Sequence, residues 1–184
     1  MKELSHFLGL QIKQAKVGIF INQSKYISDT PKKYGMESTN ATTTPMNTTT
    51  KLTKDEESKE VDEKLYRGMI RSLFYLTTSR LGTILGVCLC ARFQCCPKYS
   101  HLSDVKRIFR YLSGSKNVGL WNPKNDCFDL VGYSDADHAG SQLDRKNTSV
   151  TCQFLGNSLV SWFSKKQNCV ALSTTESEYV AVSS

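Results

Sequence analysis

The chain has 184 residues, of which 39% are hydrophobic, and its 24 Lys and Arg residues against 17 Asp and Glu residues give a formal net charge of +7. That length suits one domain or two small ones, and the composition excludes wholesale disorder. The apolar stretch 81–91 has eleven uncharged residues, whereas a membrane span needs about 20, so we expect no membrane partner. Residues 1–6 lack the features of a secretory leader, so the expected location is intracellular, in the cytoplasm or the nucleus, and not secreted.

Seven cysteines are scattered through apolar surroundings. An odd number in this pattern is typical of reduced core thiols in an intracellular protein. The alternative is a zinc site, but the candidate ligands do not have the paired C-x₂-C spacing that tetrahedral zinc favours. Those candidates are Cys88, Cys90, Cys95, Cys96 and His101.

Charge is divided unevenly along the chain. Residues 1–54 carry +5, residues 55–66 carry −4, residues 67–124 carry +9 and residues 125–184 carry −3. A basic segment followed by an acidic one is expected when one part of a protein binds a polyanion and another binds cations. The other explanation is a solvated basic surface that binds nothing.

The first predicted elements are short strands. Apolar and β-branched residues run over 6–12 and 17–23, separated by a polar KQAK, and this pattern predicts a hairpin. The segment 24–34 predicts a basic helix interrupted at Pro31. The Thr-rich segment 38–53 follows and predicts a flexible or extended connection, the expected boundary between structural units.

Three helices are predicted in the middle of the chain. Apolar residues recur at three- and four-residue spacing over 65–76, with Asp62 placed to cap the helix and Gly82 to mark its end or a break. A more apolar helix is expected over 83–93. The third, over 101–112, has an apolar face and a basic outer side, and Gly114 would stop it. The basic side chains of this helix are Lys106, Arg107 and Arg110.

After residue 117 the periodicity changes to that of strands. A short strand is expected over 117–121. The runs 127–133, 148–155 and 158–163 predict a three-stranded antiparallel meander, in which a Gly-Asn dipeptide makes the second turn.

Two carboxylates follow the strand predicted over 127–133. Asp135 and Asp137 are two residues apart, so they point to the same side if the strand continues that far. Like charges this close repel unless a cation bridges them, and carboxylate oxygens suit Mg²⁺ or Mn²⁺. A turn or a helix cap is the other explanation for this motif.

The last predicted helix opens with a capping box. Ser173 and Glu176 have its three-residue spacing, which gives Glu176 a capping role. Glu178 lies further inside the helix and has no such local role. Its carboxylate faces either solvent or a metal ion.

Eight sequence motifs follow one another along the chain in a fixed order. They are HFLGLQI, YRGMIRSLFYLTTSR, CARF, HLSDVKRIFRYLSG, GYSDADHAG, DRKNTS, SLVSWFSKKQ and ALSTTESEYVA. On these motifs the chain resembles the Pol polyproteins of copia-type LTR retrotransposons, from the end of the reverse transcriptase into the beginning of RNase H. The resemblance extends over essentially all 184 residues.

The resemblance implies an α+β fold with an N-terminal β-hairpin, a helical connection, and a partial RNase H-like three-stranded antiparallel meander with its first helix. Residues 1–54 would be the end of the reverse transcriptase, with a thumb remnant, and 55–66 an acidic linker. Residues 67–124 would be a basic helical connection, and 125–184 a truncated RNase H-like domain. The implied nucleic-acid contacts are Phe7, Leu8 and Gly9 in a primer-grip-like hairpin and Lys106, Arg107 and Arg110 in the connection.

The resemblance also implies a catalytic site. Asp135 and Glu178 would be catalytic carboxylates and ligands of Mg²⁺ or Mn²⁺, with Asp137 as a further ligand, and we expect Asp135 and Glu178 to lie close together on one side of the sheet. The implied partners are an RNA–DNA hybrid and the remainder of the Pol polyprotein. Two-metal cleavage needs a fuller set of acids, and the polymerase motif Tyr-x-Asp-Asp is absent. We therefore expect a fragment that is related to hybrid cleavage but inactive alone.

Two alternatives stay open: a non-catalytic nucleic-acid-binding module, and a decayed element product with no function. Some positions depart from the family pattern. Arg71 stands where Gly is usual, Leu81–Gly82 where Pro-Asp is usual, and Asn147 and Val150 replace Ser and Gly. We expect Arg71 on a packed helix face to cost about 1–3 kcal/mol of stability.

Overall fold

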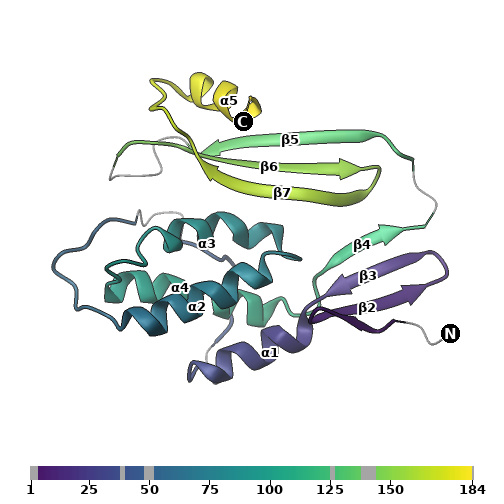
Figure 1. The fold of residues 1–184 in the computed structure, drawn as a ribbon, viewed down its shortest axis with the longest axis horizontal. Coiled ribbons are helices and arrows are strands. Elements are labelled where there is room, and N and C mark those ends of the chain that lie inside the picture. Colours follow the sequence, from purple (N-terminus) through teal and green to yellow (C-terminus); the bar gives the residue numbers. More distant parts are fainter. Residues whose placement is uncertain (1–3, 38–39, 48–51, 125–126, 138–143, 184) are drawn as a thin grey trace.

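The computed structural model describes residues 4–37, 40–47, 52–124, 127–137 and 144–183. Within them lie a four-stranded sheet, a group of helices, and a three-stranded sheet that lies over the helices (Figure 1). The predicted α+β class is confirmed. The elements are β1 (His6–Phe7), β2 (Leu10–Ala15), β3 (Gly18–Asn22), α1 (Ser24–Lys33), α2 (Glu63–Leu76), a 3₁₀ helix (Leu81–Thr83), α3 (Ile84–Ala91), α4 (Tyr99–Gly114), β4 (Leu120–Pro123), β5 (Leu130–Asp137), β6 (Thr148–Leu155), β7 (Ser158–Lys166) and α5 (Thr174–Val182).

The predicted N-terminal hairpin is confirmed as the antiparallel pair β2–β3, but an additional turn precedes it. Leu8 and Gly9 have φ of 47° and 79°, the two positive values of a type I′ turn. This turn separates β1 from β2. Gly9 is required because a Cβ atom there would overlap the hydroxyl of Tyr75, which donates a hydrogen bond to the Leu8 carbonyl.

The short strand predicted over 117–121 forms slightly later, as β4, and pairs antiparallel with β3. Phe20 lies opposite Trp121 in this pair. The strand that follows the helices therefore completes the N-terminal sheet, whose strand order is β1-β2-β3-β4. Residues from two of the charge-defined segments, 1–54 and 67–124, share one sheet.

Helix α1 is continuous through Pro31, so the predicted interruption is wrong. A proline lacks a backbone N–H and usually breaks a helix interior, but Pro31 lies in the last turn and the helix ends two residues later at Lys33. The Pro31 ring is buried.

The predicted helices of the middle segment are confirmed, and they enclose the main core, but α2 ends at Leu76 and not at Gly82, which lies in the 3₁₀ helix. Asp62 caps α2 by accepting a hydrogen bond from the Lys64 N–H at 2.8 Å. Tyr66, in α2, is fully buried and donates a hydrogen bond to the Cys90 carbonyl at 2.8 Å. The buried cluster consists of Ile27, Met36, Tyr66, Met69, Ile70, Leu73, Leu76, Val87, Cys90, Leu102, Val105, Ile108, Phe109 and Leu112.

Arg71 is exposed, so the expected cost of an arginine on a packed face is wrong. The side chain reaches water and needs no buried counter-charge. All seven cysteines are free thiols, but only Cys90 is buried and four of them are exposed, so the prediction of core thiols is wrong for most of them. Among the described residues, none of the helices combines the length and the apolar composition of a membrane span.

The predicted meander is confirmed as β5-β6-β7. Gly156, with φ of 59°, makes the turn between β6 and β7. Helix α5 lies on one side of this sheet and α3 on the other (Figure 1). The Trp162 indole N–H donates to the Thr77 carbonyl at 2.9 Å, so β7 is joined directly to the end of α2.

Candidate functional site

Strand β5 extends through Asp137, so Asp135 and Asp137 point to the same side of the sheet, as predicted. The register shows which side this is. Asp137 lies opposite Thr148 in β6, which in turn lies opposite Lys166 in β7. Directly opposed residues share a face, and this is the face toward α3, because Thr148 accepts a hydrogen bond from Arg92 at the end of that helix.

Helix α5 covers the opposite face. Gln167 donates hydrogen bonds to the Ser149 hydroxyl at 3.1 Å and to the Ser177 carbonyl at 2.9 Å. Ser149 and Ser177 are both buried. The predicted cap is confirmed at Ser173, whose hydroxyl accepts from the Glu176 N–H at 3.1 Å. The Glu176 carboxylate accepts from the Leu172 N–H at 2.7 Å, one residue before the cap, so it caps the helix start but does not make the reciprocal bond of a capping box.

Glu178 reaches β5 at the edge of the sheet. Its carboxylate accepts a hydrogen bond from the Ala136 N–H at 3.3 Å, and Ala136 is the residue between the two predicted aspartates. Since β6 occupies the other edge of β5, this N–H points outward. Glu178 thus starts from the opposite face to Asp135 and meets the strand at its outer edge, which corrects the expectation that both side chains lie on one side of the sheet.

This edge has the chemistry of a hard-cation site. Asp135 and Glu178 are both exposed, so a cation could reach both carboxylates from water. Among the residues that the structure describes, there is no group of three or more His, Cys, Asp or Glu side chains that could hold a metal ion. Mg²⁺ commonly keeps several waters and binds through one or two carboxylates, so the pair fits a hydrated ion. Residues 138–140, which complete the GYSDADHAG motif, lie outside the described residues.

A second charged group lies beside Asp137. Arg92, directly after α3, donates from Nη2 to the Thr148 hydroxyl at 2.7 Å. Asp144 forms an ion pair with Lys166. Burial lowers the pKa of Arg92, while the charges of Asp144 and Asp137 act in the opposite direction. Sequence reasoning gave Arg92 and Thr148 no role, although they lie in the quoted CARF and DRKNTS motifs.

The predicted basic residues of α4 divide between two environments. Lys106 and Arg110 line one small hollow of about 150 Å³ together with Tyr99. Arg107 lies elsewhere on the helix and donates to the Thr44 hydroxyl at 2.8 Å. All three side chains are partly buried, so the structure brings two of them together and turns the third toward the Thr-rich segment.

The predicted Phe7-Leu8-Gly9 segment lies at the tight turn of the N-terminal sheet, distant in sequence from the carboxylates. Phe7 and Leu8 are 53% and 77% exposed, which leaves both side chains available to a partner. Tyr75 holds the turn against α2.

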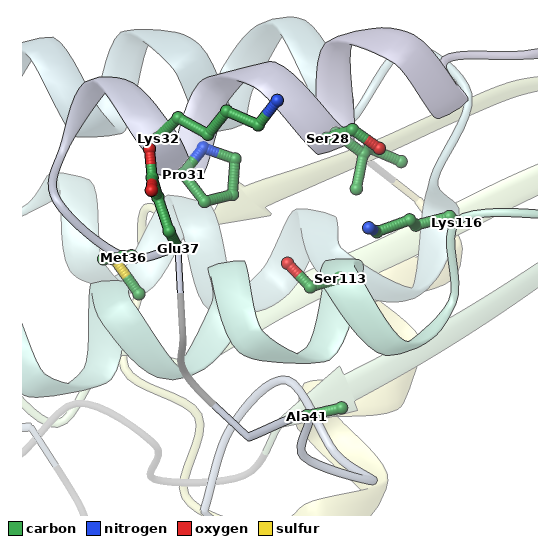
Figure 2. Close-up of a pocket in the computed structure, with 9 residues that line it drawn as sticks. Ser28, Pro31, Lys32, Met36, Glu37, Ala41, Ser113 and Lys116 are labelled. Carbon is green, nitrogen blue, oxygen red and sulfur yellow. The ribbon is translucent and has the colours of Figure 1, made fainter.

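A cavity of about 590 Å³ lies between α1 and the C-terminal end of α4. In Figure 2 the Lys116 amine and the Ser113 hydroxyl point into the space below Ser28. None of the candidate site residues that the sequence predicts lines this cavity. One of its lining residues, Lys116, belongs to the same basic segment, 67–124, as α4.

Comparison with known proteins identifies relatives of this sequence. The chain is 38% identical over 98% of its length to the Retrovirus-related Pol polyprotein from transposon RE1 of Arabidopsis thaliana, of which it spans 12%. It is 33% identical over 98% of its length to the corresponding polyprotein from transposon TNT 1-94 of Nicotiana tabacum, of which it spans 14%. The chain thus matches a short segment of each of these two polyproteins.

An uncharacterized mitochondrial protein of Arabidopsis thaliana is similar over 99% of the chain, with 32% identity, and the chain spans 77% of it. The chain belongs to the family of copia-type retrotransposon Pol polyproteins, as the motifs predicted. No family model matches the sequence, and no solved structure matches it.

Proposed function

We propose that this chain supplies part of the RNase H site of a copia-type Pol polyprotein, which cleaves the RNA strand of an RNA–DNA hybrid with Mg²⁺ or Mn²⁺. The observation that carries the proposal is the hydrogen bond between the Glu178 carboxylate and the Ala136 N–H. It joins a helix to a strand 42 residues away and brings the Glu178 carboxylate to the backbone of the residue that follows Asp135.

Asp135 and Glu178 are the proposed metal ligands. A bound divalent ion would supply Lewis-acid chemistry at a phosphodiester. Asp135 projects from the strand, and Glu178 is oriented by the Ala136 N–H, which occupies Oε1 and leaves Oε2 for a cation. Two carboxylates give weak binding, with a Kd on the order of 1 mM. The chain alone is therefore expected to bind the ion without efficient cleavage, and the remainder of the polyprotein would complete the site.

The test is Mn²⁺ binding by the full chain, measured from the loss of the free-ion electron paramagnetic resonance signal. Asp135→Asn and Glu178→Gln should each weaken binding at least about tenfold. Glu176→Gln is the matched control, because glutamine retains an acceptor for the Leu172 N–H, and it should leave binding unchanged. If the wild-type chain binds no Mn²⁺, or if the control weakens binding as much as Glu178→Gln, the proposed site is wrong.

Nucleic-acid binding is a second candidate function, and the proximity of Lys106 and Arg110 favours it. Both line one hollow on α4, and their segment carries ten basic residues against one acid. Contacts with phosphates release counterions, so the affinity for a hybrid should fall steeply with salt. Replacing Lys106 and Arg110 together with Gln should reduce the magnitude of the slope of log K against log salt by about 2. An unchanged slope would remove these residues from the interface.

A further inference from the structure

The acids at the end of β5 have different neighbours. Glu178 lies at the outer edge of the sheet, whereas Asp135 and Asp137 both lie in rows of side chains that cross all three strands, and only the row of Asp137 contains a second charged residue. Asp137, Thr148 and Lys166 are opposed in register. Opposed side chains in antiparallel strands have Cβ atoms about 4.5–5.5 Å apart, so the row is continuous.

Arg92 meets this row at its centre. Its guanidinium donates to the hydroxyl of Thr148, a residue that is 1% exposed. Thr148 is flanked by Asp137 on one side and by Lys166 on the other, and Lys166 is paired with Asp144. A half-buried guanidinium needs a nearby anion to offset its desolvation. Asp137 and Asp144 are the carboxylates placed to provide it.

We propose that Asp137 positions the site rather than binding metal. Arg92 holds Asp137, Thr148 and Lys166 in a charged row that joins α3 to the sheet at the end of β5. Asp135 and Glu178 then remain as the metal ligands. The part of this inference that concerns metal rests on the proposed function. The row itself is independent of it, because it follows from the register and from the Arg92–Thr148 hydrogen bond.

The row has a mechanical consequence. The C-terminal end of β5 carries Asp135, and without a tie to the helices an edge strand frays at its end. Helix α5 supplies one such tie through the Glu178–Ala136 hydrogen bond, and Arg92 supplies another from the opposite face, through Thr148 of the neighbouring strand β6. Trp162 also joins the sheet to the helices, through Thr77, so loss of Arg92 loosens the end of β5 without detaching the sheet.

The first arm of the test is a double-mutant cycle in unfolding. Arg92→Gln and Asp137→Asn should each raise the unfolding equilibrium constant about tenfold, and the double variant should raise it by about the same factor rather than a hundredfold. Arg92→Lys, which keeps the charge, should recover part of the loss. The matched control is the exposed ion pair of Glu63 and Arg67, 2.7 Å apart, whose coupling should stay within about twofold.

The second arm is Mn²⁺ binding by the same variants. Asp137→Asn should leave the Kd within about threefold of wild type. Arg92→Gln should tighten binding about fivefold, because a nearby positive charge is removed and Asp137 is released. Adding Asp137→Asn to Arg92→Gln should remove part of that gain.

The outcomes separate the two proposals. Additive effects in the unfolding cycle would overturn the charged row, whether or not the chain binds metal. A coupled cycle combined with a loss of Mn²⁺ affinity in Asp137→Asn as large as that in Asp135→Asn would overturn the positioning role and make Asp137 a ligand. If wild type binds no Mn²⁺, the proposed function fails, while the unfolding cycle still decides the row.

Discussion

The turn at Gly9 allows a quantitative prediction about how the N-terminal sheet is attached to α2. Gly9 has φ of 79°, and a left-handed backbone costs an alanine about 1–2 kcal/mol. A Cβ atom at Gly9 would also overlap the Tyr75 hydroxyl and lie 3.2 Å from Tyr75 Cζ. Tyr75 would have to move and lose its hydrogen bond to Leu8, at a further cost of about 0.5–1.5 kcal/mol. Gly9→Ala should therefore lower the free energy of unfolding by about 2–3 kcal/mol.

Urea unfolding followed by tryptophan fluorescence measures this loss. Gly35→Ala is the control, since Gly35 has φ of 65° but a Cβ atom added there would meet no atom within 4 Å, and it should cost only about 1 kcal/mol. Tyr75→Phe removes the hydroxyl that overlaps, so Gly9→Ala should cost less in that background than in wild type. A Gly9→Ala loss no larger than that of Gly35→Ala, or strict additivity with Tyr75→Phe, would refute the reasoning.

Three further predictions concern single side chains. Leu8→Asn should raise the free energy of unfolding by about 1 kcal/mol, because Asn-Gly is preferred in a type I′ turn and Leu8 is 77% exposed; urea unfolding measures it. Tyr66→Phe should cost about 1–2 kcal/mol in the same assay, because the buried Cys90 carbonyl loses its donor. Burial raises the pKa of Asp104 above its ordinary 3.8, against the opposing charges of nearby cations. A raised pKa means that its ionisation opposes folding as the pH rises through the folded value, so Asp104→Asn should reduce the loss of stability across that range in thermal melts at stepped pH.

Local sequence patterns predicted an element correctly where a turn or a cap bounds that element. The strand over 148–155 was predicted at its observed bounds because alternating residues end at a Gly-Asn turn. Asp62 was identified as a cap because its side chain acts on a backbone N–H two residues away. Both signals are contained within a few residues, and both were confirmed.

Bounds were less accurate where apolar residues are exposed. The strand predicted over 127–133 forms over Leu130–Asp137. Phe128 is 83% exposed and Leu130 is 71% exposed, so apolar character at these positions does not reflect burial within the chain. The segment gives the periodicity of a strand but cannot show which residues will pair with β6.

Contacts between distant segments were the main features that local patterns could not provide. Nothing near β4 shows that it joins the N-terminal sheet, because its partner β3 lies about a hundred positions earlier in the chain and the pairing depends on how the helices bring both ends together. The basic residues of α4 are a similar case. Helical spacing shows that Arg107 lies off the apolar face, but the contact with Thr44 depends on the path of a segment 63 residues away.

The acidic residues near the C-terminal end show why a motif alone does not assign a role. Glu176 is explained by its own turn of helix, since its carboxylate accepts from the Leu172 N–H at 2.7 Å. Glu178 is only two residues further on, yet its partner is the Ala136 N–H of another element. Asp137 follows Asp135 on the same face but lies opposite Thr148, where Arg92 binds. The neighbours of each carboxylate are therefore set by the element that faces it. The register of β5 against β6 places uncharged Val150 opposite Asp135, but places Thr148, with its Arg92 contact, opposite Asp137.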